Sequence, residues 1–340
     1  MSSRAFITGI SALELSHAER EFIREARPWG FILFKRNIET PTQVSNLVHE
    51  LRDSIGNAYA PILIDQEGGR VQRLGPPHWP VYPPGAVFAA LYDVDPALGL
   101  AAARLSSRLI AADLIDLGIT VDCLPLADVP VAGADAVIGN RAYGTEPAKV
   151  ASIARAVTGG LQQGGVLPVL KHIPGHGRAT ADSHFGLPTV DTTRAELERT
   201  DFAAFQPLAD LPMAMTAHVV FSALDPAHPA TTSATIIQQV IRGVIGFQGL
   251  LMSDDVSMNA LAGTIAERTR AIVNAGCDMV LHCNGRLDEM RDVARETPEL
   301  AGEALERAER ALASRTPPLP FDRLAAWAEL DALMDRVGTV

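Results

Sequence analysis

The chain has 340 residues, of which 47% are hydrophobic and 20% are charged, a composition typical of a folded globular protein and not of a disordered one. Its formal net charge of −11 argues against a nucleic-acid partner or an anionic membrane surface, because both attract proteins with an excess of positive charge. No apolar run approaches the roughly 20 residues of a membrane span, and the N-terminal segment lacks the pattern of a signal peptide. Three cysteines show neither disulfide-scaffold nor zinc spacing. We therefore expect a cytoplasmic protein with no membrane or nucleic-acid partner.

Short apolar runs alternate with longer helical patterns along most of the chain. The candidate strands, in chain order, are 5–7, 30–34, 62–65, 119–124, 166–171, 214–216, 249–254 and 279–281. Strands that alternate with helices predict a parallel α/β architecture, and eight is the number that closes a (β/α)8 barrel of TIM type. A doubly wound sheet is the alternative, but the chain has no early G-x-G-x-x-G motif to support it. We expect one domain over residues 1–340.

Helical patterns fill the connections between these strands, and the clearest are 42–54, 97–115, 146–164 and 233–244. Ser233 and Thr264 stand where each would cap the N-terminus of a helix. Arg104, Arg108 and Asp113 recur at helical spacing within 97–115, which predicts an amphipathic helix with a polar face.

Ionisable residues follow several strands at the point where each strand ends. Asp65 follows the third strand, Lys171 and His172 follow the fifth, His218 follows the sixth, and Asp254 follows the seventh. The carboxyl ends of all strands in a barrel open onto one face, where the active site is built. We therefore expect these side chains to lie close together although they are far apart in sequence.

The first dense motif is D-Q-E-G-G-R-V-Q-R at residues 65–73. Its glycine pair permits a tight turn directly after a strand, which would fold Arg70 and Arg73 back over the barrel mouth beside Asp65. Carboxylate and guanidinium groups suit the recognition of sugar hydroxyls. A surface turn with ion pairs is the structural alternative.

The second motif is K-H-I-P-G-H-G at residues 171–177, and it continues to D-S-H at 182–184. His172 and His176 have the spacing of metal ligands on a helix, but the intervening Pro-Gly pair argues against a helix there. Asp182 and His184 are two residues apart and can form a carboxylate–imidazole pair. Such a carboxylate would orient the imidazole so that it can hold and deliver a proton.

The third motif is L-L-M-S-D-D-V-S-M at residues 250–258. Asp254 stands at the strand end, where a carboxylate nucleophile can be fixed beside an electrophilic carbon. The neighbouring Asp255 should point elsewhere, and we expect it to cap the next element or to support the site.

At these motifs the sequence resembles glycoside hydrolase family 3, specifically the bacterial cytoplasmic β-N-acetylhexosaminidases of cell-wall recycling. The resemblance extends from residues 32–34 to 276–278 and depends on K-H-x-P-G-H-G…D-S-H together with S-D-D-x-S-M. It implies a (β/α)8 barrel and a retaining exo-β-N-acetylglucosaminidase that removes terminal N-acetylglucosamine from 1,6-anhydro-muropeptides. Other branches of the family take their acid/base from a second domain, for which this chain is too short.

The resemblance also implies roles for individual residues. Asp254 matches the nucleophile that forms a covalent glycosyl-enzyme, His184 matches the general acid/base, and Asp182 matches its dyad partner. A histidine acid/base departs from the usual carboxylate pair of retaining glycosidases. The residues that match contacts to the sugar are Asp65, Arg73, Arg141, Lys171 and His172. No cofactor and no metal are implied.

Three alternatives remain open from the residues themselves. A metal-dependent barrel hydrolase would use His172, His176, Asp182 and His184 as ligands. A β-N-acetylglucosaminide phosphorylase would share the first chemical step and use phosphate as acceptor. A catalytically silent barrel would bind carbohydrate without turnover. In each case we expect a small-molecule partner, a carbohydrate for the favoured interpretation, and a monomeric protein.

Overall fold

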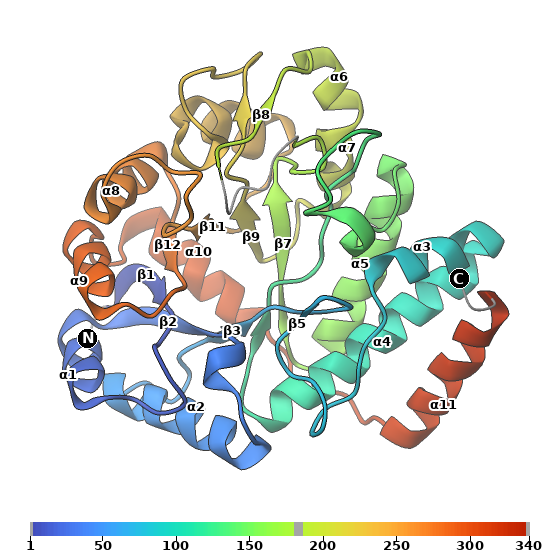
Figure 1. The fold of residues 1–340 in the computed structure, drawn as a ribbon, viewed down its shortest axis with the longest axis horizontal. Helices are drawn as coiled ribbons and strands as arrows, with labels where there is room; N and C mark the ends of the chain where they lie inside the picture. The colour runs from blue at the N-terminus through green and yellow to red at the C-terminus, as the bar shows by residue number, and fades with distance from the viewer. Residues whose placement is uncertain (1–2, 180–185, 338–340) are drawn as a thin grey trace.

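The computed structural model of the protein describes residues 3–179 and 186–337. Eight parallel strands close into a barrel in the order β1-β12-β11-β9-β7-β6-β3-β2, and helices surround them (Figure 1). The barrel strands are β1 (Arg4–Thr8), β2 (Pro28–Leu33), β3 (Ile62–Ile64), β6 (Val121–Asp122), β7 (Leu167–Ile173), β9 (Met213–Thr216), β11 (Leu250–Asp255) and β12 (Met279–His282). Each coincides with a predicted strand, so the prediction of a (β/α)8 barrel is confirmed.

The helices of the described residues lie outside the barrel. They are α1 (His17–Ala26), α2 (Pro41–Ile55), α3 (Gly85–Val94), α4 (Pro96–Asp116), α5 (Pro147–Gln163), α6 (Arg194–Arg199), α7 (Asp201–Phe205), α8 (Ile265–Ala275), α9 (Leu287–Glu296), α10 (Gly302–Ala313), α11 (Arg323–Met334) and a π-helix at Ile236–Val244. Thr264 caps α8 through a reciprocal pair of hydrogen bonds with Glu267, and Ser233 Oγ accepts from the Ile236 N–H. Of these helices, none combines the length and apolar character needed to cross a membrane.

Two apolar clusters make up the core of the molecule. The smaller one gathers inward-facing strand residues such as Ile7, Ile32, Leu63 and Val169 inside the barrel. The larger one lies between the outer faces of the strands and the surrounding helices. This division follows from the period of two along a strand, which sends alternate side chains to opposite faces. All three cysteines are buried and free.

Helix α4 differs from the prediction for residues 97–115. Arg104 is exposed, but Arg108 is buried; its Nη2 donates to the Leu319 carbonyl at 2.7 Å, and its guanidinium stacks on the Phe321 ring. Asp113 accepts from the Tyr82 hydroxyl at 2.7 Å. The predicted helix is confirmed, but most of its expected polar face is covered, because α11 and the residues just before it pack beside α4 (Figure 1).

A short antiparallel hairpin, β4 (Gln66–Gly68) and β5 (Val71–Gln72), follows β3 at the barrel mouth. Gly68 and Gly69 have φ values of +96° and +58°, in the region that favours glycine. A Cβ on Gly68 would lie 2.3 Å from the Pro83 carbonyl oxygen. The predicted tight turn is therefore confirmed, and no side chain fits at its first glycine.

Candidate active site

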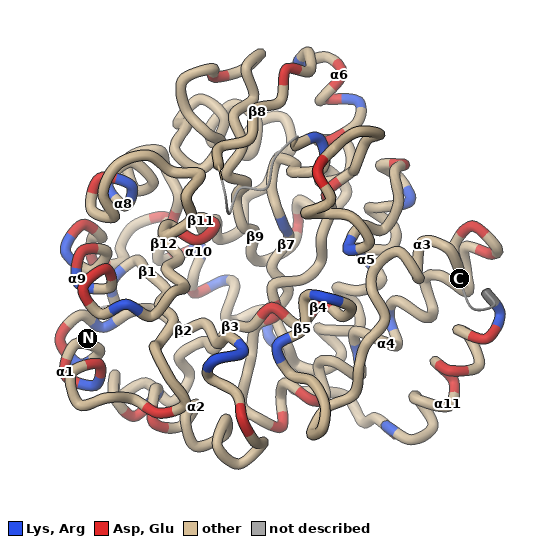
Figure 2. The backbone as a smooth tube through the Cα atoms, in the orientation of Figure 1, with Lys and Arg blue, Asp and Glu red and all other residues tan. Residues whose placement is uncertain are grey.

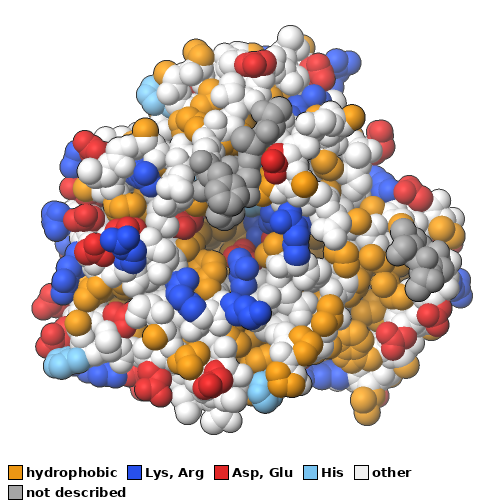
Figure 3. Space-filling view, in the orientation of Figure 1, with side chains coloured by type: hydrophobic (Ala, Val, Ile, Leu, Met, Phe, Trp, Pro, Cys, Tyr) orange, Lys and Arg blue, Asp and Glu red, His pale blue; other side chains and the backbone are white. Residues whose placement is uncertain are grey.

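A pocket of about 240 Å³ opens at the carboxyl ends of the barrel strands. Figure 3 shows it as a hollow in the middle of this face, with Lys and Arg side chains along its rim. Every predicted site residue within the described part of the chain lines this pocket: Asp65, Arg73, Arg141, Lys171, His172 and Asp254. Asp182 and His184 lie outside the described residues. Four segments that are distant in sequence, around residues 65–73, 141, 171–172 and 254, are thus brought to one cavity.

The hairpin after β3 brings Arg73 back to Asp65. The buried Gln66 side chain braces it, because its Oε1 accepts from the backbone N–H groups of Arg73 and Leu74 at 2.9 and 3.0 Å. Arg73 Nη2 then donates to Asp65 Oδ2 at 3.0 Å. Both side chains of this pair are fixed before any ligand arrives.

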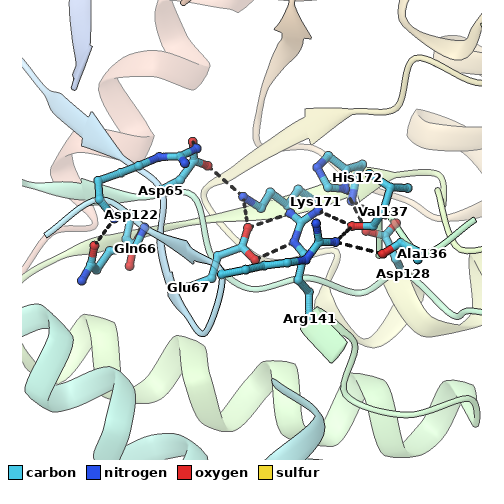
Figure 4. A network of polar contacts seen from close by, with 12 residues as sticks. Asp65, Gln66, Glu67, Asp122, Asp128, Ala136, Val137, Arg141, Lys171 and His172 are labelled. Atoms are coloured by element: carbon cyan, nitrogen blue, oxygen red, sulfur yellow. Dashed lines mark hydrogen bonds and ion pairs between the residues drawn. The ribbon is translucent and has the colours of Figure 1, made fainter. Parts of the chain in front are cut away.

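Lys171 on β7 joins this pair to a second carboxylate that sequence reasoning missed. Its Nζ lies 2.9 Å from Asp65 Oδ1 and 2.6 Å from Glu67 Oε1. Arg141 donates to both oxygens of Glu67, at 2.7 and 2.8 Å (Figure 4). Asp65 lies between β3 and β4 and Glu67 lies on β4, so one hairpin brings both carboxylates to Lys171. The second carboxylate of D-Q-E was the signal that could have revealed Glu67.

Charges in this network hold one another ionised. Burial acts to raise the pKa of Asp65, but Lys171 and Arg73 outweigh it and leave that pKa below its ordinary value. Burial likewise opposes Arg141 and Lys171 at Glu67, yet the two cations lower the pKa of Glu67 to about 2. Burial lowers the pKa of Lys171, but Asp65 and Glu67 together raise it by more, so the net change is upward. Figure 2 shows acidic and basic residues close together around β3, β4 and β5.

Asp128 is the second buried carboxylate that the sequence did not single out. Its Oδ2 lies 2.7 Å from His172 Nδ1, and its Oδ1 accepts from the His176 backbone N–H at 2.7 Å. With Nδ1 turned to Asp128, the ring nitrogen left to face a ligand is His172 Nε2. Burial acts to raise the pKa of Asp128, but His172 and His176 together lower it to about 2. The signal available was an apolar run, 123–127, that ends in an aspartate.

Asp254 lies at the end of β11, and its Oδ1 accepts from the Asp255 N–H at 2.8 Å. Burial acts to raise its pKa, but His218, His172 and that N–H lower it below the ordinary value, so the carboxylate is ionised at neutral pH. The Asp255 carboxylate is occupied by other donors, the Cys283 N–H and the Ser257 hydroxyl. Both aspartates line the pocket, but the Asp255 carboxylate is held by the chain around it, whereas Asp254 accepts from the backbone at one oxygen.

The barrel order places Asp254 opposite Asp65. Strands β11 and β3 are four positions apart in the closed ring of eight, and Lys171 and His172 come from β7, on one side between them. An ionised carboxylate therefore faces a wall of fixed donors and acceptors across a small pocket. Such a cavity suits a polyhydroxylated ring whose electrophilic carbon lies beside Asp254. Within residues 3–179 and 186–337, no group of three or more His, Cys, Asp or Glu side chains is arranged to hold a metal ion.

Comparison with known proteins identifies the class of this barrel. The model of the glycosyl hydrolase family 3 N-terminal domain matches residues 6–313. The chain belongs to glycosyl hydrolase family 3, so the predicted family and the predicted class of enzyme, a glycoside hydrolase, are confirmed.

Individual relatives agree with this assignment. A curated beta-hexosaminidase of Alkalilimnicola ehrlichii is 41% identical over 81% of this chain and 79% of its own length. The crystal structure of NagZ from Neisseria gonorrhoeae in complex with N-trifluoroacetyl-D-glucosamine is 31% identical, with a TM-score of 0.84 over 99% of this chain and 98% of that one. A family 3 beta-N-acetylglucosaminidase from a Paenibacillus species is 30% identical, with a TM-score of 0.83 over 98% of this chain and 66% of that one.

Proposed function

We propose that the protein is a retaining exo-β-N-acetylglucosaminidase that acts through a covalent glycosyl-Asp254 intermediate. The observation that carries this proposal is the placement of Asp254: ionised, held at one oxygen by a backbone N–H, and facing a pocket lined by hydroxyl-binding groups. A β-N-acetylhexosaminidase activity, the class expected from sequence, is supported by the curated relatives, which are named as beta-hexosaminidases.

The geometry suggests how the sugar lies in the pocket. The anomeric carbon would sit beside Asp254, and the hydroxyls at the far side of the ring would meet Asp65, Arg73 and Lys171 on the opposite wall. Hydrogen bonds from fixed, ionised groups are stronger than those between neutral groups and are directional. This wall would therefore set the ring in one orientation relative to the nucleophile.

The chemical steps follow from that orientation. Asp254 attacks the anomeric carbon while His184, supported by Asp182, gives a proton to the departing glycosidic oxygen. The same histidine then takes a proton from water, whose oxygen attacks the anomeric carbon and displaces Asp254. Two inversions at one carbon retain the β configuration. Both His184 and Asp182 are sequence assignments in this scheme.

The natural substrate class we propose is the N-acetylglucosaminyl-1,6-anhydro-muropeptide of cell-wall recycling, met in the cytoplasm by a monomeric enzyme. Arg73, Arg141 and Lys171 are cations of the pocket that would meet such an anionic ligand in a protein with a net charge of −11. In the structure they are paired with Asp65 and Glu67. Three cations against two carboxylates leave a net charge of +1 on this wall, so attraction of the anionic aglycone would be modest.

Covalent trapping tests the proposal. The protein is incubated with a 5-fluoro N-acetylglucosaminyl fluoride, digested with a protease, and its peptides are examined by mass spectrometry. We expect the label on Asp254, and a β-configured first product when an ordinary β-N-acetylglucosaminide is followed by proton NMR. A label on any other residue, or an α-configured first product, would contradict the assignment.

Two further measurements separate the alternatives. Turnover in phosphate buffer should yield free N-acetylglucosamine, whereas N-acetylglucosamine 1-phosphate would indicate a phosphorylase. Activity should survive exhaustive chelation, and a loss that zinc restores would indicate a metal-dependent hydrolase. A silent barrel would bind the sugar and release nothing in either assay.

A further inference from the structure

Glu67 carries no role in the scheme above, yet it contacts two residues that line the pocket. We propose that Glu67 is a positioning residue for sugar binding: it holds Lys171 and Arg141 side by side in the orientation in which they meet the ligand. The proposal rests on the proposed function, because it deepens the description of the same pocket. Glu67 itself does not line the cavity, so it would act through the two cations and not by touching the sugar.

The contacts of Glu67 are those of a clamp between two like charges. Its Oε1 receives both Lys171 Nζ, at 2.6 Å, and Arg141 Nη2, at 2.7 Å, and its Oε2 receives Arg141 Nε at 2.8 Å. The Arg141 contact is the two-pronged arrangement that fixes a guanidinium plane. Without a carboxylate between them, the two buried cations would repel each other and move apart.

Glu67 is rigid enough for this task. Its side chain is only 4% exposed, and it stands on β4, whose far end is locked by the glycine turn against Pro83. Gln66 ties the same strand to the returning chain at Leu74, because its side-chain Nε2 donates to the Leu74 carbonyl and its Oε1 accepts from the Leu74 N–H. A positioning residue must itself be held by its surroundings, and here backbone and side chain are both fixed.

The chain contains a matched carboxylate that likewise joins two cations, away from the candidate active-site pocket. Asp278 accepts from Arg242 Nη2 at 2.8 Å and from Arg307 Nη1 at 2.9 Å, and it also accepts from the Leu251 N–H. It precedes β12, at the end of the barrel opposite the candidate active site, and none of these residues lines the cavity. A purely structural role for Glu67 would make the two carboxylates behave alike when each is neutralised.

The experiment compares Glu67→Gln, Glu67→Asp and Asp278→Asn in the full chain, with a chromogenic β-N-acetylglucosaminide as substrate. An amide offers one acceptor oxygen and turns an NH2 donor toward the second cation, so both cations lose their fixed positions. Because they bind the sugar in ground and transition states alike, we expect KM of Glu67→Gln to rise about 10-fold or more, with a smaller fall in kcat. Glu67→Asp keeps the charge and should recover part of the KM effect. Asp278→Asn should leave KM and kcat unchanged.

Thermal unfolding of all variants and calorimetric titration with N-acetylglucosamine complete the test. If Glu67→Gln is less stable but has wild-type KM and wild-type affinity for the sugar, Glu67 is structural and the inference is wrong. If Glu67→Gln does not fold, Glu67→Asp decides: an unchanged KM would equally overturn the inference. If the wild-type protein neither cleaves the substrate nor binds the sugar, the proposed function itself has failed, an outcome distinct from failure of the Glu67 inference.

Discussion

The two ends of this barrel each contain a buried carboxylate between two cations, but the ends use the arrangement differently. At the amino ends of the strands, Asp278 connects Arg242, in the π-helix at Ile236–Val244, to Arg307 on α10. At the carboxyl ends, Glu67 connects Arg141 and Lys171 beside an open pocket. The first network is satisfied by the protein alone. The second presents part of its charge to a cavity.

This difference shows what distinguishes a site from a structural ion cluster of the same composition. Buried ion pairs contribute little net stability, because desolvation offsets much of their attraction. The ion pairs of Asp278 connect α10 to the barrel. Beside the pocket, the same kind of pairing keeps Lys171 and Arg141 charged and fixed in orientation, so that both can bind a ligand in the cavity. Neutralising one carboxylate at a time tests this difference between the two ends.

The largest effect is expected at Asp254, at the carboxyl end. Asp254→Asn removes the nucleophile while keeping the shape of the side chain, so kcat/KM should fall about 10³-fold or more. Steady-state kinetics on a chromogenic β-N-acetylglucosaminide measures this. Circular dichroism and an unchanged affinity for N-acetylglucosamine would serve as controls for folding. A variant with more than a tenth of wild-type activity would exclude Asp254 as the nucleophile.

Asp278→Asn should have its effect on stability alone. Neutralising Asp278 leaves the buried Arg242 without its carboxylate partner and Arg307 with Glu303 alone, and we expect a loss of about 3 kcal/mol. Urea unfolding followed by tryptophan fluorescence reports this loss, and kcat/KM should stay at the wild-type value. Reduced activity in a fully folded variant would contradict the expectation that Asp278 acts on stability alone.

His176 gives the pocket end a pH-dependent stability. Burial lowers the pKa of His176 from 6.5 to about 4, so between these values the unfolded chain binds a proton that the folded protein does not. Stability should therefore fall as pH decreases from 6.5 to 4, by at most about 3 kcal/mol from this group. Urea midpoints of the wild type and His176→Asn across that range test it. The variant should show a flatter dependence, and parallel curves would contradict the assignment.

Asp128→Asn should give the smallest effect, at the same end. The amide keeps one hydrogen bond to the loop but no longer fixes the His172 ring, so a shift of the imidazole should lower kcat/KM by about 10-fold to 100-fold. Kinetics on the folded variant checks this. A matched comparison is Asp225→Asn, at a partly exposed carboxylate that contacts His228 outside the pocket, where no kinetic change is expected.

Much of this molecule could be predicted from strand ends. All eight barrel strands lie where apolar runs occur, and the aspartate, lysine and histidine that follow them line one pocket. Glu67 and Asp128 escaped notice because neither stands directly at the end of a predicted strand. Their importance arises from contacts with residues far along the chain: Glu67 contacts Lys171, and Asp128 contacts His172, 44 positions later. Residue spacing along the chain does not predict such contacts.

The sequence by itself determined the alternation of strands and helices, the turn at Gly68 and Gly69, and the residues whose chemistry fits the site. Local backbone preference and hydrophobic period act over a few residues, so they are visible in a linear pattern. Tertiary structure alone decided which charges neutralise one another and which remain for a ligand. It paired Arg73, Lys171 and Arg141 with Asp65 and Glu67, and it buried Arg108 under the C-terminal segment. Coulombic energy and desolvation depend on distance and burial in space, and only the closed barrel fixes both.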